Sequence, residues 1–292
     1  MRISNIDTFK ETEEICLKGL YKKDDDTIYL KLTREEMESV HLFSPEFIDK
    51  IELDCTNSSI TDHPKSIRLS NKDSFTAAYD LASGGYIDNG EHILVLNFAS
   101  PINPGGGVKR GLSAQEEDLC RKSTLYCSLS SEKAGEYYSY NRQLGDPIYS
   151  DYMMISPFVE IFRDSKGDFL DKTVIVSVIT AAAPICDESI YDEGCRSAEE
   201  ISAVFGSRIR KLLKVSAISG YRYLILGAWG CGAFGNDAKD VAKLFYEALL
   251  EYATLFYDIE FAVYCKDKRD YNYRAFSEFF SVEQNDFSFD NQ

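Results

Sequence analysis

The sequence predicts an α/β fold, in which a mixed central sheet carries helices on both faces and follows an N-terminal helical extension. Short apolar runs of strand length alternate with amphipathic segments of helical length along most of the chain. Two of these strand-like runs each lead into a glycine-rich loop and then a helix. Hydrophobic residues make up 44% and aromatic residues 13% of the 292 positions, which is ample for a core. We therefore expect one globular unit, with residues 1–65 packed as an extension on a main domain of residues 66–292.

The extension is expected to be mainly helical. Residues 5–21 place apolar side chains among acids and lysines with an imperfect helical period. Residues 27–32 alternate as a strand does, and residues 34–40 suit a short helix. Residues 54–65 are rich in Asn, Ser, Thr and Asp, which is typical of a loop. The segment before this loop is too small and has too few strands to form a hydrophobic core of its own.

The main domain alternates strand and helix signals. The expected strands are short β-branched or aliphatic runs at residues 66–69, 92–96, 173–180, 223–226 and 260–264. The expected helices run from Asp73 to about Ser83, closed by Gly84 and Gly85, then over residues 115–130, 197–216, the segment after Asn236, and 267–280. Residues 131–172 are expected to be irregular. The many tyrosines of this segment either anchor it to the rest of the domain or stack on bases.

The most informative stretch, residues 95–120, reads VLNFASPINPGGGVKRGLSAQEEDLC. A strand ends here, and three consecutive glycines follow, Gly105, Gly106 and Gly107. A single turn needs a positive φ angle at only one or two positions, so three glycines indicate that another group approaches the backbone closely. A strand, a glycine loop and a helix N-terminus surround one concavity with N–H groups, which predicts an anion site.

Two carboxylates, Glu116 and Glu117, follow at the mouth of this predicted anion site. Acids beside a bound anion are electrostatically costly unless they act on the ligand, so the pair indicates chemistry. Glu116 has a structural alternative, because Ser113 and Glu116 match a capping box. Glu117 points about 100° further around the helix and cannot serve the same cap. Its alternative is a solvated acid favoured by the helix dipole, but the glycines upstream favour a function.

The spacing of these motifs resembles a known signature. Three glycines, seven further residues and then Gln115, Glu116 and Glu117 are similar to the signature of bacterial-type poly(ADP-ribose) glycohydrolases, which are macrodomain enzymes. Residues 155–164 also resemble that family, and the resemblance extends over roughly residues 8–280. It implies a three-layer α/β/α macrodomain-like fold and hydrolysis of the ribose–ribose O-glycosidic bond of poly(ADP-ribose), with release of ADP-ribose.

A second strand, glycine loop and helix follow near the end of the chain. The loop resembles the diphosphate loop of macrodomains, with Phe234 near a ribose or base and with Ala233 smaller than the pattern suggests. Either Asn236 or Asp237 is expected to cap the next helix. The predicted substrate contacts in this loop are Gly230, Cys231, Gly232, Ala233, Phe234, Gly235 and Asn236.

The resemblance also implies roles for individual residues. Glu117 would be the general acid that protonates the leaving ribose oxygen and then the base that activates water. Glu116 would hold ribose hydroxyls. Asp73 would accept from the adenine amino group, cap its helix, do both, or do neither. The remaining implied substrate contacts are Asn97, Asn103, Gly105, Gly106, Gly107 and Gln115. No metal or redox cofactor is implied.

Three other functions fit parts of the sequence. Gly230, Gly232 and Gly235 match the dinucleotide fingerprint GxGxxG, but only 27 residues follow Cys265, which leaves no room for the further units of a Rossmann dehydrogenase. A non-catalytic reader of ADP-ribose has no need of the acidic pair. A hydrolase of mono-ADP-ribosylated or related substrates differs in substrate rather than fold, so the sequence discriminates poorly against it.

The charge balance limits the partners. A formal net charge of -16 argues against broad binding of nucleic acids or anionic membranes, which needs a basic face. Lys109, Arg110, Arg121 and Lys122 flank the signature and form either a local positive patch or, for the last two, ordinary helix-surface charges. The expected partners are poly(ADP-ribose) or ADP-ribose and ADP-ribosylated proteins, without sequence-specific nucleic acid or membrane. We expect a monomer.

Cysteine usage and the chain start bear on the compartment. The eight cysteines include no CxxC pair and there are only three histidines, so zinc-site spacing is absent. The first ten residues do not resemble a signal peptide, and no apolar run of about 18 residues occurs. We therefore expect reduced thiols and an intracellular protein.

Overall fold

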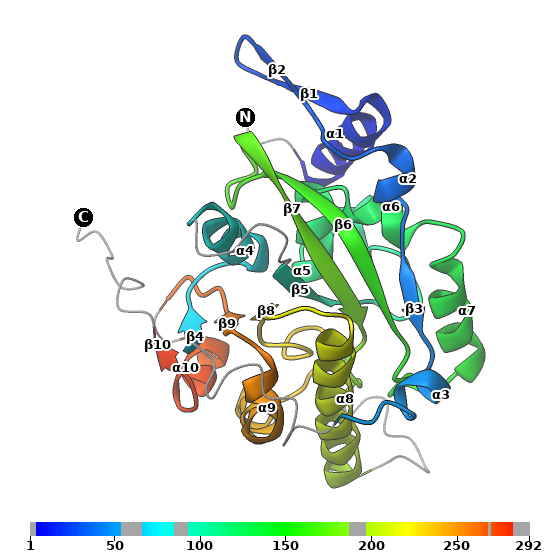
Figure 1. Ribbon diagram of the computed structural model, residues 1–292, viewed down its shortest axis with the longest axis vertical. Coiled ribbons are helices and arrows are strands. Elements are labelled where there is room, and N and C mark those ends of the chain that lie inside the picture. The colour runs from blue at the N-terminus through cyan, green and yellow to red at the C-terminus, as the bar shows by residue number, and fades with distance from the viewer. Residues whose placement is uncertain (1–3, 54–65, 85–92, 187–196, 268–269, 283–292) are drawn as a thin grey trace.

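The computed structural model describes residues 4–53, 66–84, 93–186, 197–267 and 270–282 (Figure 1). Within them an eight-stranded mixed sheet lies between two layers of helices, which confirms the predicted α/β/α class. Among the helices described, none is both long enough and apolar enough to span a bilayer.

The sheet has the order β10-β4-β9-β8-β5-β7-β6-β3. Neighbours from β10 to β7 run parallel, and β6 and β3 are antiparallel additions at one edge. The carboxyl ends of β4, β9, β8, β5 and β7 therefore meet along one edge, where open α/β sheets bind their ligands. The strands are β3 (His41–Phe43), β4 (Ser66–Ser70), β5 (Ile93–Phe98), β6 (Met153–Arg163), β7 (Phe169–Ala181), β8 (Tyr223–Leu226), β9 (Asp258–Ala262) and β10 (Ser281–Val282).

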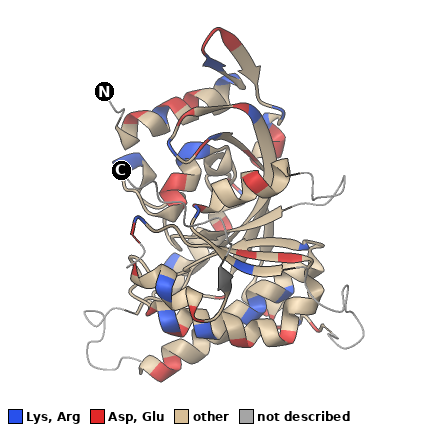
Figure 2. Cartoon of the chain, turned by 90° about the vertical axis from the view of Figure 1, so that its left-hand side faces the viewer, with Lys and Arg blue, Asp and Glu red and all other residues tan. Residues whose placement is uncertain are grey.

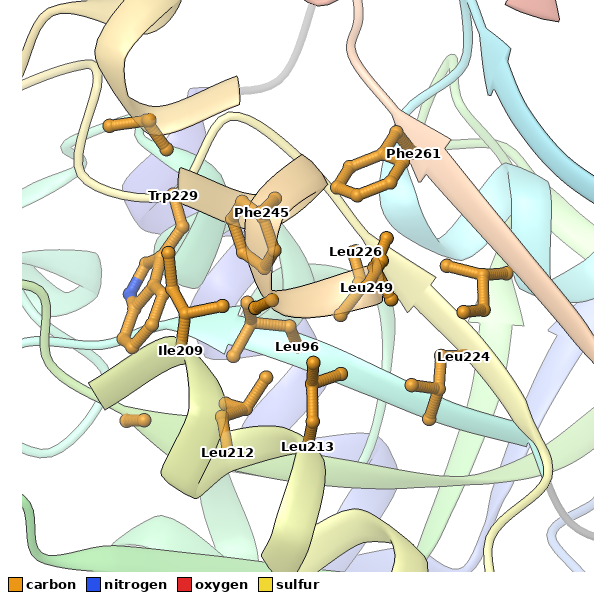
Figure 3. Packing of buried hydrophobic residues seen from close by; sticks show 14 of the residues in the cluster. Leu96, Ile209, Leu212, Leu213, Leu224, Leu226, Trp229, Phe245, Leu249 and Phe261 are labelled. Atoms are coloured by element: carbon orange, nitrogen blue, oxygen red, sulfur yellow. The ribbon is translucent and has the colours of Figure 1, made fainter. Parts of the chain in front are cut away.

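Alternate side chains of the strands pack on opposite helix layers. Leu94 and Leu96 of β5 point toward the layer formed by α8 (Ala198–Ile218), α9 (Ala238–Tyr252) and α10 (Tyr271–Ser277). Figure 3 shows Leu96 among side chains of α8 and α9 in this core. Ile93 and Val95 pack instead on the opposite layer. Its helices are α4 (Ser74–Ser83), α5 (Gln115–Lys122), α6 (Leu125–Leu129) and α7 (Gly135–Leu144).

The N-terminal segment contains more than helices. Helix α1 (Asn5–Lys18) ends at Gly19 and is followed by a hairpin of β1 (Leu20–Lys23) and β2 (Asp26–Tyr29), so the strand expected at residues 27–32 begins and ends slightly earlier. Short helices α2 (Arg34–Met37) and α3 (Pro45–Ile48) flank β3. Because β3 pairs with β6, this segment completes one edge of the main sheet. The domain boundary at residue 65 stays a prediction.

The prediction of one continuous helix over residues 115–130 is wrong, because this segment forms two helices, α5 and α6. Ser123 adopts an extended backbone between α5 and α6 and forms a bridge with Ile161 of β6. The Ser123 hydroxyl also accepts a hydrogen bond from Leu125 N–H at 3.1 Å. A tertiary contact with a distant strand therefore breaks a segment whose local pattern is helical.

The predicted irregular excursion over residues 131–172 is also wrong. It contains α7, the 11-residue strand β6 and the start of β7. Pro157 interrupts the strand pattern, and the β6–β7 register shifts between Ser156 and Val159, which accommodates it. Tyr137, Tyr138 and Tyr152 are buried and pack edge-on, which supports the anchoring role.

The other expected elements are confirmed within a few residues, although α10 is shorter than predicted. Two 3-10 turns were not predicted, η1 (Val108–Arg110) and η3 (Ala253–Leu255). Residue 92, Gly85 and the tail beyond Val282 lie outside the described residues.

Candidate active site

The two glycine loops lie side by side at the carboxyl edge of the sheet. The first follows β5 and leads through η1 into α5, and the second follows β8 and leads into α9. Because β5 and β8 are hydrogen-bonded neighbours that run parallel, both loops leave the same edge (Figure 1). The sheet thus brings together two motifs that are more than a hundred residues apart in the chain.

Glu117 is buried directly under the first loop. Its side chain is only 6% exposed, and Oε1 accepts a 2.7 Å hydrogen bond from the main-chain N–H of Gly107. Its other oxygen, Oε2, is buried and has no hydrogen-bond partner among the described residues. A buried carboxylate oxygen without a partner is rare in folded proteins, so this atom is available to a ligand.

The glycines are required by contacts within the protein. A Cβ on Gly106 would lie 2.5 Å from Oε1 of Glu117 and 3.0 Å from Oε2 of Glu116. Gly105 would meet the ring of Tyr126 at 2.8 Å, and both glycines have positive φ angles. The prediction that another group approaches this backbone is confirmed, and in the structure the approaching groups include the two carboxylates.

Glu116 faces the end of β5 rather than its own helix start. Its Oε2 accepts from Ser100 N–H at 2.8 Å, and Oε1 accepts from Asn97 Nδ2 at 3.2 Å. The predicted capping box is therefore wrong, because the helix begins after Ala114 with no side-chain cap and donors from the strand end occupy the carboxylate. Burial raises the pKa of Glu116 to about 8, and the neighbouring charge of Glu117 acts in the same direction.

Asn97 and Gln115 hold the acidic helix against β5. Asn97 is fully buried and also donates to Thr180 Oγ1 at 3.3 Å. Gln115 accepts from Phe98 N–H at 2.9 Å and donates to the carbonyl of Leu96 at 2.8 Å, so its amide clamps the start of α5 to the strand. These bonds make both residues structural supports of the carboxylate pair, and their predicted contacts with a substrate stay predictions.

Asp73 caps α4, which confirms the capping role expected for it. Its Oδ1 accepts from Phe75 N–H and Thr76 N–H at 3.1 and 3.0 Å. Its Oδ2 accepts from the Thr76 hydroxyl at 2.7 Å and lies 3.4 Å from Nζ of Lys122. The carboxylate is therefore tied both to its own helix and to the last turn of α5.

The predicted positive patch is reduced to two residues. Arg121 and Lys122 are 6% and 5% exposed and pair with Asp118, so they are neither patch residues nor helix-surface charges. Arg121 also donates to the carbonyl of Leu112 at 2.6 Å and so holds the first loop. Lys109 and Arg110 are exposed. Figure 2 shows acidic and basic positions interspersed along the helices.

The second loop is closed by Asn236, while Asp237 caps α9. Asn236 Nδ2 donates to the carbonyls of Pro184 and Gly230 at 2.8 and 3.1 Å. Asp237 accepts from Lys239 N–H and Asp240 N–H, which settles the capping alternative in its favour. Gly230 has a φ of 75°, and a Cβ there would meet Ala183 at 2.7 Å.

Three loop amides are available to an anion. The N–H groups of Gly232, Ala233 and Phe234 donate to no acceptor in the part of the chain described here. Cys231 bonds within the loop, with its N–H on the carbonyl of Ala228 at 3.2 Å, and Gly235 N–H closes a turn on Gly232 at 3.0 Å. These contacts shape the loop around free donors, as a phosphate cradle requires.

The remaining predicted contact, Asn103, is exposed and shapes the first loop through its backbone. Its N–H donates to Ser100 Oγ at 3.1 Å, and its carbonyl accepts from Gly106 N–H at 3.0 Å. The sequence interpretation missed Ser100 and Thr180, which complete the support of Glu116 and Asn97. Both are polar residues at or just after the ends of predicted strands, and this is the sequence feature that could have identified them. Among the described residues, no cluster of His, Cys, Asp and Glu side chains could hold a metal ion.

Comparisons with known proteins agree with this geometry. Residues 9–164 match the family model of the microbial-type PARG catalytic domain, where PARG denotes poly(ADP-ribose) glycohydrolase. PARG from Thermomonospora curvata is 33% identical, with a TM-score of 0.86 and coverage of 94% of this chain and 99% of that one. Its complex with the inhibitor ADP-HPD is similar, at 31% identity, a TM-score of 0.81 and coverage of 94% and 98%.

PARG from Deinococcus radiodurans, solved in complex with ADP-ribose, is 34% identical with a TM-score of 0.76, and the match covers 86% of this chain and 98% of that one. No curated protein matches the sequence. The family match covers more than half of the chain, and the solved structures extend the similarity over nearly its whole length. The chain therefore belongs to the microbial-type PARG family.

Proposed function

We propose that this protein hydrolyses the ribose–ribose O-glycosidic bond of poly(ADP-ribose) and releases ADP-ribose, with Glu117 as general acid and base. One observation carries the assignment to Glu117. One of its carboxylate oxygens is fixed by Gly107 N–H, and the other is buried without a partner among the described residues beside the glycine loop. A positioned acid with one oxygen held and the other free suits proton transfer to a bound substrate.

The placement of the substrate follows the order of strands along the carboxyl edge. The adenine end would lie toward Asp73 after β4, and the diphosphate would lie between the free amides of the loop after β8 and the glycines after β5. The bond to be cut then falls beside Glu117. The ADP-ribose and ADP-HPD complexes of the relatives support a ligand of this chemistry.

The reaction balances with one acid/base residue. Protonated Glu117 gives its proton to the ribose oxygen of the leaving chain as the bond from that oxygen to the anomeric carbon breaks, leaving an oxocarbenium-like centre. The Glu117 carboxylate then takes a proton from water, whose oxygen bonds to the anomeric carbon. ADP-ribose leaves with a hydroxyl at that carbon, and Glu117 is protonated again.

Glu116 is proposed to orient the ribose. Because burial raises the pKa of Glu116 to about 8, this carboxyl is largely protonated at neutral pH and can donate a hydrogen bond to a ribose hydroxyl. A neutral Glu116 also reduces repulsion between the acidic pair and the substrate diphosphate. ADP-ribosylated proteins as natural substrates and a monomeric state are further parts of the proposal.

The test is the Glu117→Gln variant. The glutamine side chain keeps the shape and the acceptor for Gly107 N–H but cannot transfer the proton. ADP-ribose release from purified poly(ADP-ribose) is followed by chromatography, and ADP-ribose binding by calorimetry, for the wild type and the variant. We expect the wild type to cleave, and the variant to bind but not cleave. If both bind and neither cleaves, the protein is a reader or acts on another ADP-ribosylated species; if neither binds, the proposed function is wrong.

A further inference from the structure

Tyr149 holds a backbone conformation that tyrosine rarely adopts. Its φ angle is 57°, and among the described residues the other non-glycine residue with a positive φ is Asp24, at 51°. Asp24 lies in the turn between β1 and β2, where a small polar residue tolerates this conformation. Tyr149 is bulky and closes a turn between α7 and β6, in which its N–H donates to the carbonyl of Asp146 at 2.9 Å. Glycine or asparagine is the usual residue where a turn needs a positive φ, so a tyrosine here carries backbone strain.

A buried arginine holds this strained segment. Arg208 of α8 is 1% exposed and donates to the carbonyls of Ile148 and Tyr149 at 2.9 and 3.2 Å. The same guanidinium donates to the carbonyl of Ala182 at 2.9 Å and to Oδ1 of Asp151 at 2.7 Å. Arg208 therefore connects the Tyr149 segment to the carboxyl end of β7.

The chain beyond β7 connects that segment to the second glycine loop. Ile185 N–H donates to the carbonyl of Pro147 at 3.4 Å, and Cys186 N–H donates to the carbonyl of Phe234 at 2.7 Å. The rings of Tyr149 and Phe234 have centroids 6.3 Å apart, with 37° between their planes. Both rings are half-buried, and the Tyr149 hydroxyl makes no hydrogen bond to a described residue. The two rings form one aromatic surface beside the free loop amides.

The order of strands indicates which part of a substrate this surface meets. Along the carboxyl edge the order is β4, β9, β8, β5 and β7, with Asp73 after β4 and the carboxylate pair after β5. Arg208 attaches Tyr149 to the end of β7, at the side of Glu117 that is remote from Asp73. The ring therefore lies toward the end of the site where the scissile bond is placed, rather than the adenine end.

We propose that Tyr149, together with Phe234, packs against the ribose that carries the scissile bond, and that the Tyr149 hydroxyl bonds to a hydroxyl group of that ribose. This inference rests on the proposed function and adds a specificity-determining contact to it. The strained backbone is the structural requirement for placing this ring, and Arg208 supplies the contacts that maintain it.

Calorimetry with two probes tests the contact. ADP-ribose contains the ribose that carries the scissile bond, called the distal ribose here, and ADP lacks it. Tyr149→Ala and Tyr149→Gly are expected to bind ADP-ribose about tenfold more weakly, the loss expected for one aromatic contact, with an unchanged affinity for ADP. Tyr149→Phe separates the ring from the hydroxyl, and is expected to lose only part of the affinity.

Thermal unfolding of the same variants tests the strain. Glycine adopts a positive φ freely, so Tyr149→Gly is expected to be more stable than Tyr149→Ala, the reverse of the usual order. Asp24→Gly is the matched control, because it relieves the other positive φ far from the site and should leave ADP-ribose binding unchanged.

The outcomes separate this inference from the proposed function. Unchanged ADP-ribose affinity in Tyr149→Gly and Tyr149→Ala would make the ring purely structural and overturn the inference, even with an active wild type. An equal loss of ADP affinity would overturn the assignment to the distal ribose. Failure of the wild type to bind ADP-ribose would instead overturn the proposed function.

Discussion

The main-chain N–H of Gly107 donates a 2.7 Å hydrogen bond to Oε1 of Glu117, and the second oxygen of that carboxylate is buried with no partner among the described residues. The glycine loop and the acidic helix are thus one unit, in which the loop backbone orients the acid. Gly106 permits this arrangement, because any side chain there would occupy the space of the two carboxylates.

Replacing Gly106 by Ala is expected to abolish most of the activity. The new Cβ would lie 2.5 Å from Oε1 of Glu117, at a φ of 59° that alanine disfavours. Displacing a reacting group by about 1 Å can cost about a hundredfold in rate, and the backbone strain costs about 1–2 kcal/mol. Steady-state kinetics and thermal unfolding measure both effects. Gly135→Ala is the control, since its Cβ meets nothing within 4 Å at the start of α7. Full activity in Gly106→Ala would contradict the role of this glycine.

The stability of the wild type is expected to fall as pH rises from about 4.5 to about 8. Glu116 ionises near its ordinary value in the unfolded chain, whereas burial raises its pKa to about 8 in the folded protein. Over that window the folded state keeps a proton that the unfolded state has lost, so deprotonation favours unfolding. The loss is at most about 5 kcal/mol. Urea titrations of wild type and Glu116→Gln at several pH values check this, and equal pH slopes in the two proteins would refute it.

Two variants of Asp73 distinguish its contribution as a helix cap from the contribution of its negative charge. Asp73→Ala removes the acceptor for two N–H groups of α4 and is expected to cost about 1 kcal/mol of stability. Asp73→Asn keeps an acceptor at the helix start, and should retain most of that stability while losing the negative charge beside Lys122. Denaturant unfolding and ADP-ribose calorimetry are measured on both. A large affinity loss in Asp73→Asn without a stability loss would favour the adenine contact; unchanged affinity would leave Asp73 as a cap alone.

Arg208→Met is expected to destabilise the protein by about 3–5 kcal/mol. It removes the donors to the buried carbonyls of Ile148 and Ala182, to the half-buried carbonyl of Tyr149 and to the Asp151 carboxylate. Lys211→Met is the matched comparison, because Lys211 also pairs with Asp151 but is 21% exposed. Lys211 is only partly buried and also pairs with Asp49, and its loss should cost about 1 kcal/mol, less than the loss of the buried guanidinium. Similar midpoints for both variants in urea would show that Arg208 is not the main support of this segment.

Some features of this protein were predictable from local sequence because they depend on neighbouring residues. The strands β5, β7 and β8 are apolar runs, and their buried patterns are visible in the chain. The two glycine loops and the acidic pair were recognised from spacing, and the Asp73 cap from one residue type at a helix start. Hydrophobic periodicity and capping are short-range properties, so the order of residues along the chain is enough to predict them.

Other features were decided only by the tertiary structure. The break between α5 and α6 comes from the pairing of Ser123 with β6. Glu116 does not form the predicted capping box, because its carboxylate accepts hydrogen bonds from Asn97 and Ser100 instead. The position of Tyr149 depends on Arg208, 59 residues away in the chain. The sequence by itself determined the fold class, the family and the motifs that carry the chemistry. The tertiary structure decided which donor each buried polar group uses, because that choice depends on distances between segments that become neighbours only when the sheet is assembled.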